Sequence, residues 1–215
     1  MIPHYRTKIE QRKILEKTFV LETLFDLDEA IEQLCESLGD HPDPFAEDKC
    51  PYYGVLWPAA EGLVQLLLKN QARLKDKKII EVGCGLAFPS LVASSLKADI
   101  LATDFHPGVP QFLERNLRHN SLTLNYQRFN WRDTIDSIGT FDIVMGSDVL
   151  YEPRHPSDVA MGFKRLLNPG GEVWLSDPGR GYLQKFVDQM KELGFKYEFE
   201  PQKVSTYEMY NFRFY

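Results

Sequence analysis

Two glycines and one acidic residue carry the first chemical signal in this sequence. Gly83 and Gly85 follow the apolar run over residues 78–82, where a strand is expected to turn into a helix. Glycine at such a turn lets the backbone bend sharply and lets a ligand approach main-chain N–H groups. Asp104 comes 19 residues after Gly85, a spacing typical of an acidic residue that accepts hydrogen bonds from a ribose. The pattern predicts a ribose-containing ligand at this turn.

Glu81 and Ala87 narrow the choice of ligand. Glu81 lies inside an apolar strand, and a buried carboxylate is costly unless it is paired, so we expect it to bind backbone or a cationic ligand group. Ala87 stands where the dinucleotide fingerprint has its third glycine, which argues against an NAD-linked oxidoreductase. The alternative is a plain strand-to-helix turn in which Asp104 only caps a helix.

The composition excludes several classes of protein. The chain has 215 residues, of which 43% are hydrophobic and 26% charged, as in an ordinary globular protein. A net charge of −6 argues against nucleic-acid binding, which needs a basic surface. The three cysteines are scattered and form no C-x-x-C pair, so neither disulfides nor zinc are predicted. The N-terminus has no signal-peptide core, so we expect a cytoplasmic protein with no membrane partner. Nothing in the sequence requires a metal, and none is expected.

Strands that alternate with helices are expected to position these residues. We predict helices over residues 58–70, 89–96, 109–119, 157–167 and 182–193, and strands over residues 78–82, 98–103, 126–129, 141–145, 172–176, 195–199 and 208–214. This order predicts an α/β fold with a Rossmann-like, mostly parallel seven-stranded sheet, helices on both faces and an antiparallel C-terminal hairpin. The ligand is expected beyond the carboxyl ends of the strands.

The first part of the chain is predicted to be an extension of that domain. A strand over residues 18–24 and a helix from residue 26 to Gly39 precede a loop over residues 40–52 that is rich in proline. We therefore divide the chain into an N-terminal extension, residues 1–51, and a main domain, residues 52–215.

Several motifs of the main domain resemble those of the seven-β-strand methyltransferases. Glu-Val-Gly-Cys-Gly at residues 81–85 is similar to their motif I, Asp104 matches their acidic ribose ligand, and Asn-Pro-Gly-Gly at residues 168–171 resembles the turn before their fifth strand. The resemblance implies S-adenosyl-L-methionine as methyl donor, with S-adenosyl-L-homocysteine as product. The donor-binding residues it implies are Trp57, Glu81, Gly83, Cys84, Gly85, Asp104, Phe105, Asn130, Trp131 and Ser147.

A narrower resemblance concerns the methyl acceptor. Ser-Asp-Val-Leu-Tyr at residues 147–151 looks like the D-x-x-Y motif of the family-16 protein methyltransferases, which include many lysine methyltransferases. Tyr-Gly-Val-Leu-Trp-Pro at residues 53–58 resembles their aromatic segment, and residues 176–180 resemble the branch that methylates the electron-transfer flavoprotein β-subunit. The resemblance implies that Asp148 and Tyr151 are catalytic and that a protein lysine is the acceptor.

The chemistry of methyl transfer to an amine assigns roles to these residues. The amine must lose its proton before it attacks, and a nearby carboxylate raises an amine's pKa. Asp148 is therefore expected to recognise the acceptor rather than to act as a general base, and Asp177 is a second candidate for binding it. Alternatively, Asp148 braces a strand end, and Tyr53, Trp57, Trp131 and Tyr151 are packing aromatics.

Other functions stay open at this point. A small-molecule N- or O-methyltransferase on the same fold is the first alternative, because a fold does not determine its acceptor. A non-catalytic scaffold domain is the second. We expect a monomer in either case.

Overall fold

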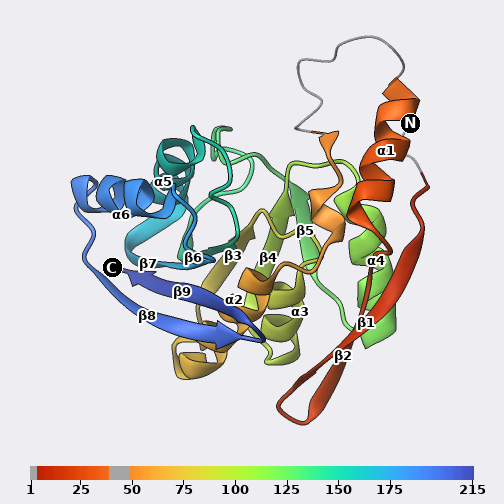
Figure 1. Ribbon diagram of the computed structural model, residues 1–215. Coiled ribbons are helices and arrows are strands. Elements are labelled where there is room, and N and C mark those ends of the chain that lie inside the picture. The colour runs from red at the N-terminus through yellow and green to blue at the C-terminus, as the bar shows by residue number, and fades with distance from the viewer. Residues whose placement is uncertain (1–3, 39–48) are drawn as a thin grey trace.

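Alternating strands and helices build a seven-stranded sheet at the centre of the protein (Figure 1). A computed structural model describes residues 4–38 and 49–215. The order of strands is β5-β4-β3-β6-β7-β9-β8, and β9 runs antiparallel to both of its neighbours while the other pairs are parallel. The predicted fold class is confirmed.

The bounds of the elements follow the periodicity of the sequence closely in the main domain. The strands are β1 (Thr7–Ile14), β2 (Lys17–Leu24), β3 (Lys78–Val82), β4 (Asp99–Asp104), β5 (Asn125–Arg128), β6 (Phe141–Ser147), β7 (Leu167–Asp177), β8 (Tyr197–Val204) and β9 (Tyr207–Phe214). The helices are α1 (Leu27–Leu38), α2 (Pro58–Lys69), α3 (Phe88–Ser95), α4 (Val109–Asn120), α5 (His155–Leu166) and α6 (Leu183–Glu192), with 3-10 turns η2 (Tyr52–Gly54) and η3 (Gln71–Leu74).

Helices cover both faces of the sheet because successive residues of each buried strand point to opposite sides. Ile79 belongs to the apolar cluster under α2 and α3, whereas Ile80 belongs to the cluster under α5 and α6. Helix α4 packs against β2 and the η2 segment, with Phe112 and Leu113 in a third cluster. Within residues 4–38 and 49–215, none of the helices is long and apolar enough to cross a membrane.

Three details differ from the predicted elements. Strand β8 was expected over residues 195–199 but extends over Tyr197–Val204. The expected turn at residues 168–171 lies inside β7: pairing passes from Phe141 opposite Leu167 to Ile143 opposite Glu172, so these residues bulge out of the ladder. Strand β1 was not predicted, because its sequence lacks an apolar face that is buried. Gly39 and most of the predicted loop over residues 40–52 lie outside the described residues.

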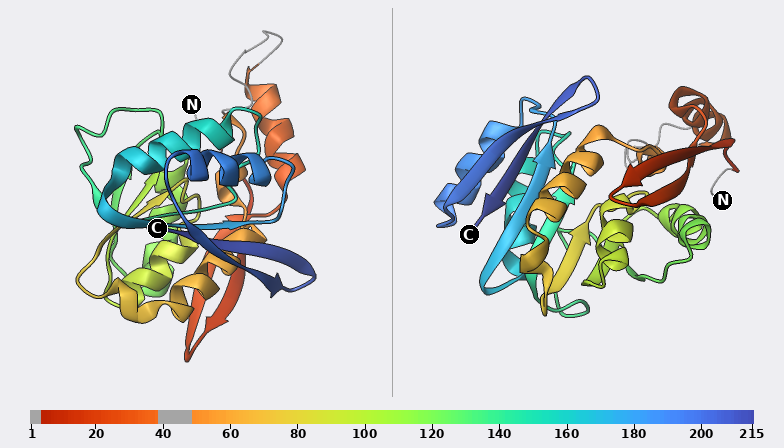
Figure 2. Two further views of the ribbon diagram at one scale, coloured as in Figure 1. Left: turned by 90° about the vertical axis from the view of Figure 1, so that its left-hand side faces the viewer. Right: turned by 90° about the horizontal axis from the view of Figure 1, so that it is seen from below.

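The N-terminal hairpin β1–β2 lies over the outer surface of the helices and shares their core. Figure 2 shows it at the opposite end of the molecule from β8 and β9. Phe19 packs edge-on against Phe88 of α3, with ring centroids 5.8 Å apart. Leu21 is fully buried in the cluster of α2 and α3. The extension is therefore joined to the main domain by a common core.

Two asparagines of α4 form hydrogen bonds with backbone groups of β2, on the edge of this strand that does not pair with β1. Asn120 accepts the Val20 N–H through Oδ1 (2.9 Å) and donates Nδ2 to the Val20 carbonyl (2.7 Å). One turn earlier, Asn116 accepts the Glu22 N–H (2.7 Å). A primary amide carries both a donor and an acceptor, so each side chain makes the kind of hydrogen bonds that a further strand would make at this edge.

We predict that Asn120→Ala lowers the free energy of unfolding by roughly 1–3 kcal/mol, because buried backbone groups of Val20 lose their partners. Urea denaturation measures the effect. The matched control is Asn125→Ala, which removes an exposed amide from β5 and should change stability by less than about 0.5 kcal/mol. Equal effects of both variants would contradict the edge-capping role.

Candidate functional site

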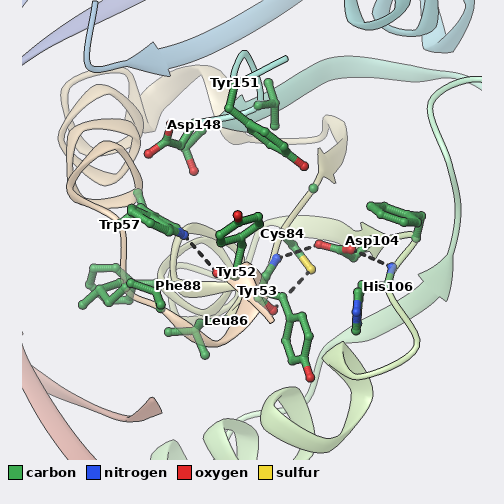
Figure 3. A pocket seen from close by; sticks show the side chains of 18 of the residues that line it. Tyr52, Tyr53, Trp57, Cys84, Leu86, Phe88, Asp104, His106, Asp148 and Tyr151 are labelled. Carbon is green, nitrogen blue, oxygen red and sulfur yellow. Dashed lines mark hydrogen bonds between the residues drawn. The ribbon is translucent and has the colours of Figure 1, made fainter. Parts of the chain in front are cut away.

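A pocket opens at the carboxyl ends of β3, β4 and β6, where the sheet order reverses direction and where α/β folds bind ligands (Figure 3). It contains about 830 Å³ of space free of protein atoms, with the open space at its mouth included. Its walls are Cys50, Tyr52, Tyr53, Val55, Leu56, Trp57, Ala60, Gly83, Cys84, Gly85, Leu86, Phe88, Asp104, Phe105, His106, Trp131, Ser147, Asp148, Val149, Tyr151 and Glu152.

The turn after β3 forms the floor of the pocket. Gly83 and Gly85 have φ values of +69° and +50°, which glycine adopts without strain. A Cβ on Gly85 would lie 3.1 Å from the carbonyl oxygen of Tyr53, so the turn also needs glycine to pack against the η2 segment. Cys84 donates its N–H to the Thr103 carbonyl of β4 (2.9 Å).

Asp104 fastens this turn to the end of β4. Its Oδ2 accepts the Gly85 N–H (3.0 Å) and its Oδ1 accepts the His106 N–H (2.9 Å). The side chain is 7% exposed, and burial raises its pKa. An ionised carboxylate has about four acceptor positions, so two hydrogen bonds leave capacity for hydroxyl groups of a ligand in the pocket.

His106 is held as a neutral imidazole beneath the same wall. Its Nδ1 accepts the Gly108 N–H (3.0 Å), so the proton lies on Nε2, which faces the Lys49 carbonyl at 3.2 Å. Burial lowers its pKa, and the ring stacks on Tyr53 with centroids 4.2 Å apart. Both ring nitrogens are occupied by backbone, which makes His106 a wall residue. Among the described residues, no group of three or more metal-ligating side chains occurs.

Glu81 is not among the residues that line the pocket, and its role in donor binding stays a prediction. Its Oε2 accepts the Ser90 N–H (3.0 Å) and the Ser90 hydroxyl. The side chain is fully buried, and burial raises its pKa to about 8. Glu81 therefore occupies the N-terminal donors of α3. Since Pro89 has no N–H, little of this helix end is left to bind a pyrophosphate.

Asn130 is likewise outside the pocket, whereas Trp131 forms part of its wall. The Asn130 N–H donates to Asp133 (3.1 Å) and its Oδ1 accepts the Arg132 N–H (2.9 Å), so Asn130 shapes a turn. The indole of Trp131 is 7% exposed and meets the ring of His155 edge-on at 5.2 Å. Trp131 thus both packs in the core and faces the ligand space.

Asp148 and Tyr151 lie together on the opposite wall (Figure 3). Asp148 has a φ of +57°, unusual for a residue with a side chain, and its N–H donates to the Ser176 carbonyl (3.0 Å). Tyr151 is 40% exposed and contacts the rings of Tyr52 and His155, with centroids 6.3 and 4.5 Å away. An acidic group beside an aromatic mouth suits a cation carried on an alkyl stem.

The structure adds partners that the sequence did not reveal. Arg180 forms an ion pair with Asp148. Asp177, expected to bind an acceptor, is fully buried and instead accepts the N–H groups of Gly179 (2.8 Å) and Arg180 (3.2 Å). Tyr52 lies at the mouth, where its carbonyl accepts the Trp57 indole N–H (2.9 Å). Asp148 and Arg180 lie in the segments 147–151 and 176–180, which the sequence analysis had singled out. Their pairing could not be predicted, because contact between separate loops depends on the tertiary structure.

Comparison with known proteins identifies relatives. Residues 47–192 match the family described as lysine methyltransferase. The chain is 28% identical over 188 residues to the protein-lysine methyltransferase METTL21E of Mus musculus, which covers 81% of this chain and 75% of that protein. It is 31% identical over 135 residues to the histone-arginine methyltransferase METTL23 of Xenopus laevis (58% and 57% covered). It is 28% identical over 153 residues to the calmodulin-lysine N-methyltransferase of Arabidopsis thaliana (66% and 50% covered). The chain spans about half the length of the latter two relatives.

Solved structures with a similar fold are also methyltransferases. One is the 16S rRNA N2 G1207 methyltransferase RsmC of Thermus thermophilus in complex with AdoMet and guanosine, with a TM-score of 0.61, 16% identity, and 97% of this chain and 50% of that one covered. Another is a methyltransferase from Pyrococcus furiosus, with a TM-score of 0.59, 21% identity, and 71% and 82% covered. At these identities the likeness concerns the fold alone.

We predict that Glu81→Gln changes how stability depends on pH. Burial raises the pKa of Glu81 from 4.5 to about 8, so the folded state binds the extra proton and stability falls as pH rises through this window. Glutamine lacks that titration, so its stability relative to the native chain should improve by up to about 1.4 kcal/mol per pH unit. Urea denaturation at pH 5, 6.5 and 8 measures it.

The control is Glu16→Gln at an exposed position of the β1–β2 turn. It should leave the difference from the native chain independent of pH. A parallel pH dependence of Glu81→Gln and the native chain would show that Glu81 is ionised in the folded protein.

Proposed function

This chain belongs to the lysine methyltransferase family, and from that premise we propose that it transfers a methyl group from S-adenosyl-L-methionine to a lysine side chain of a protein. The proposal rests on a single pocket whose two walls carry different functional groups. The glycine turn and Asp104 form one wall, and Asp148 with Tyr151 forms the other.

The donor side fits S-adenosylmethionine. Asp104 keeps acceptor capacity for ribose hydroxyls, Gly83 and Gly85 line the pocket, and the rings of Phe105 and Trp131 supply apolar surface for a base. S-adenosylmethionine, when bound, supplies a methyl group already activated by a sulfonium. Of the ten predicted donor-binding residues, those other than Glu81 and Asn130 line this space, and all ten remain proposals for that role.

On the acceptor side, this chain's residues orient a lysine and exclude water. Asp148 attracts the incoming ammonium, and the rings of Tyr52, Trp57 and Tyr151 surround an apolar entrance for its alkyl stem. The amine proton must leave before attack, and a carboxylate alone favours the charged form. Asp148 is therefore proposed to recognise the acceptor and Tyr151 to shape its approach.

The function is tested by incubating the purified chain with methyl-labelled donor and cell lysate. Native lysate is compared with lysate whose lysines have been blocked by acetylation, which removes the nucleophilic amine. We expect label in protein that disappears when lysines are blocked. Label that persists after blocking would indicate another acceptor such as arginine, which the METTL23 relative methylates by its name. Label confined to the small-molecule fraction would favour the metabolite enzyme, and no donor binding in calorimetry would favour a scaffold.

We further propose that the catalytic unit is residues 52–215, that residues 1–51 support it, and that the protein acts as a cytoplasmic monomer without nucleic-acid or membrane partners. The three cysteines are scattered and form no C-x-x-C pair, which supports a reducing compartment. The finer kinship with the branch that methylates the electron-transfer flavoprotein β-subunit also stays a prediction. Size-exclusion chromatography with light scattering tests the oligomeric state.

We predict that Asp104→Asn weakens donor binding by about 10- to 150-fold, because charge-assisted hydrogen bonds worth roughly 1.5–3 kcal/mol are lost. Calorimetry with S-adenosylhomocysteine measures the affinity. Asp99→Asn is the matched control, since Asp99 begins the same strand with an exposed side chain. Donor affinity unchanged in Asp104→Asn would remove Asp104 from the donor site.

We predict that Asp148→Asn lowers turnover more than about tenfold while donor affinity changes less than twofold. Asparagine tolerates the positive φ of this position, so the loop is kept and only the charge is removed. Asp136→Asn, in an exposed loop, is the control. If Asp104→Asn and Asp148→Asn both lose donor binding alone, the division between a donor wall and an acceptor wall is wrong.

A further inference from the structure

The acceptor wall contains a cation as well as an anion. The side chain of Asp148 is 8% exposed and pairs with the guanidinium of Arg180, whose side chain is 35% exposed. Asp148 lines the pocket, whereas Arg180 is not one of the residues that line it. A buried carboxylate without a partner would be costly, so the pair accounts for how Asp148 is kept next to the ligand space.

The loop that carries Arg180 is fixed at the end of β7. Asp177 accepts the N–H groups of Gly179 and Arg180 through one oxygen, Oδ1. Gly179 has a φ of +82°, and a Cβ there would lie 2.6 Å from the ring of Tyr210. Backbone hydrogen bonds and close packing therefore hold Arg180 at this place, in a loop that is otherwise exposed at Gly179 and Gly181.

The other charged or titratable groups around this wall come from several elements. Tyr151, Glu152 and His155 follow β6, and Asp177 ends β7. Tyr52, Tyr53, Cys50, Cys84, Asp104 and His106 line the rest of the pocket. Glu61 of α2 is paired with Arg12, and Tyr210 of β9 packs against Gly179. Burial lowers the pKa of His155 and raises that of Asp177 to about 6. Above pH 7, His155 and Asp177 therefore do not change their charge in the range where the acceptor amine loses its proton.

We propose that Arg180 is a positioning residue that offsets the charge of Asp148, so that the pocket holds the acceptor amine without stabilising its ammonium form. This inference rests on the proposed lysine methylation. Asp148 alone would raise the pKa of the acceptor amine and slow the loss of its proton. Arg180 acts through Asp148 by orienting the carboxylate and cancelling part of its field, which lowers that barrier at neutral pH.

The test compares pH–rate profiles from pH 7 to 10 for the native chain, Arg180→Gln and Arg180→Lys, with saturating donor and the lysate fraction labelled by the native chain. A partner charge shifts a pKa by about one unit or more. Arg180→Gln should therefore move the acid limb to higher pH by about one unit and lower the rate about tenfold at pH 7.5, with recovery near pH 10. Arg180→Lys keeps the charge and should follow the native profile.

A binding measurement supplies a second readout that needs no turnover. NMR titrations at pH 7.5, with S-adenosylhomocysteine present, compare n-butylammonium with its neutral isostere 1-butanol. Arg180→Gln should bind n-butylammonium about tenfold more tightly relative to 1-butanol than the native chain does. Arg118→Gln, exposed on α4, is the control and should leave the ratio unchanged.

The outcomes separate this inference from the function on which it rests. If the native chain labels no protein, the proposed function fails, while the binding ratio still tests the role of Arg180. If the native chain is active and Arg180→Gln changes neither the acid limb nor the ratio, the inference is overturned. Should Arg180→Gln not fold, Gly179→Ala displaces the loop without removing a charge and should shift the limb in the same direction.

Discussion

The hydrogen bond from the Gly85 N–H to the carboxylate of Asp104 is the constraint on which the pocket depends. It joins the turn after β3 to the end of β4, and the same carboxylate receives the His106 N–H. The glycine turn and the segment after β4, which belong to the same wall of the pocket, are thereby set relative to one another by a single side chain. Because that side chain also faces the ligand space, the donor would bind to a group whose orientation the protein has already determined.

Three buried carboxylates each hold a neighbouring segment of the chain in place through hydrogen bonds. Glu81 holds the start of α3 through Ser90, Asp104 holds the glycine turn, and Asp177 holds the loop that carries Arg180. Each accepts backbone N–H groups of a nearby segment, and burial raises the pKa of each. Burying acidic groups in strands or at their ends costs stability. Their hydrogen bonds in turn give the loops around the pocket a defined geometry.

The sequence predicts those parts of the molecule that depend on local pattern. Strand β3 was expected over residues 78–82 and lies there, because a short apolar run between polar residues has few other structures. The glycine turn and Asp104 were found for the same reason. The hydrogen bonds of Glu81 with Ser90 and of Asn130 with Asp133 were not predicted, because the partners of a polar side chain depend on packing. The pairing of Asp148 with Arg180, across two loops, could not be derived at all.

The amides that close the edge of β2 have a consequence for the newly made chain. Strand β2 is synthesised early, yet Asn116 and Asn120 follow it by 94 and 100 residues. Until α4 has formed, that edge presents free backbone groups, and exposed edges invite pairing between molecules. Contacts so distant in sequence also form slowly. The two asparagines are thus a safeguard against aggregation that begins to act only when more than half of the chain has been made.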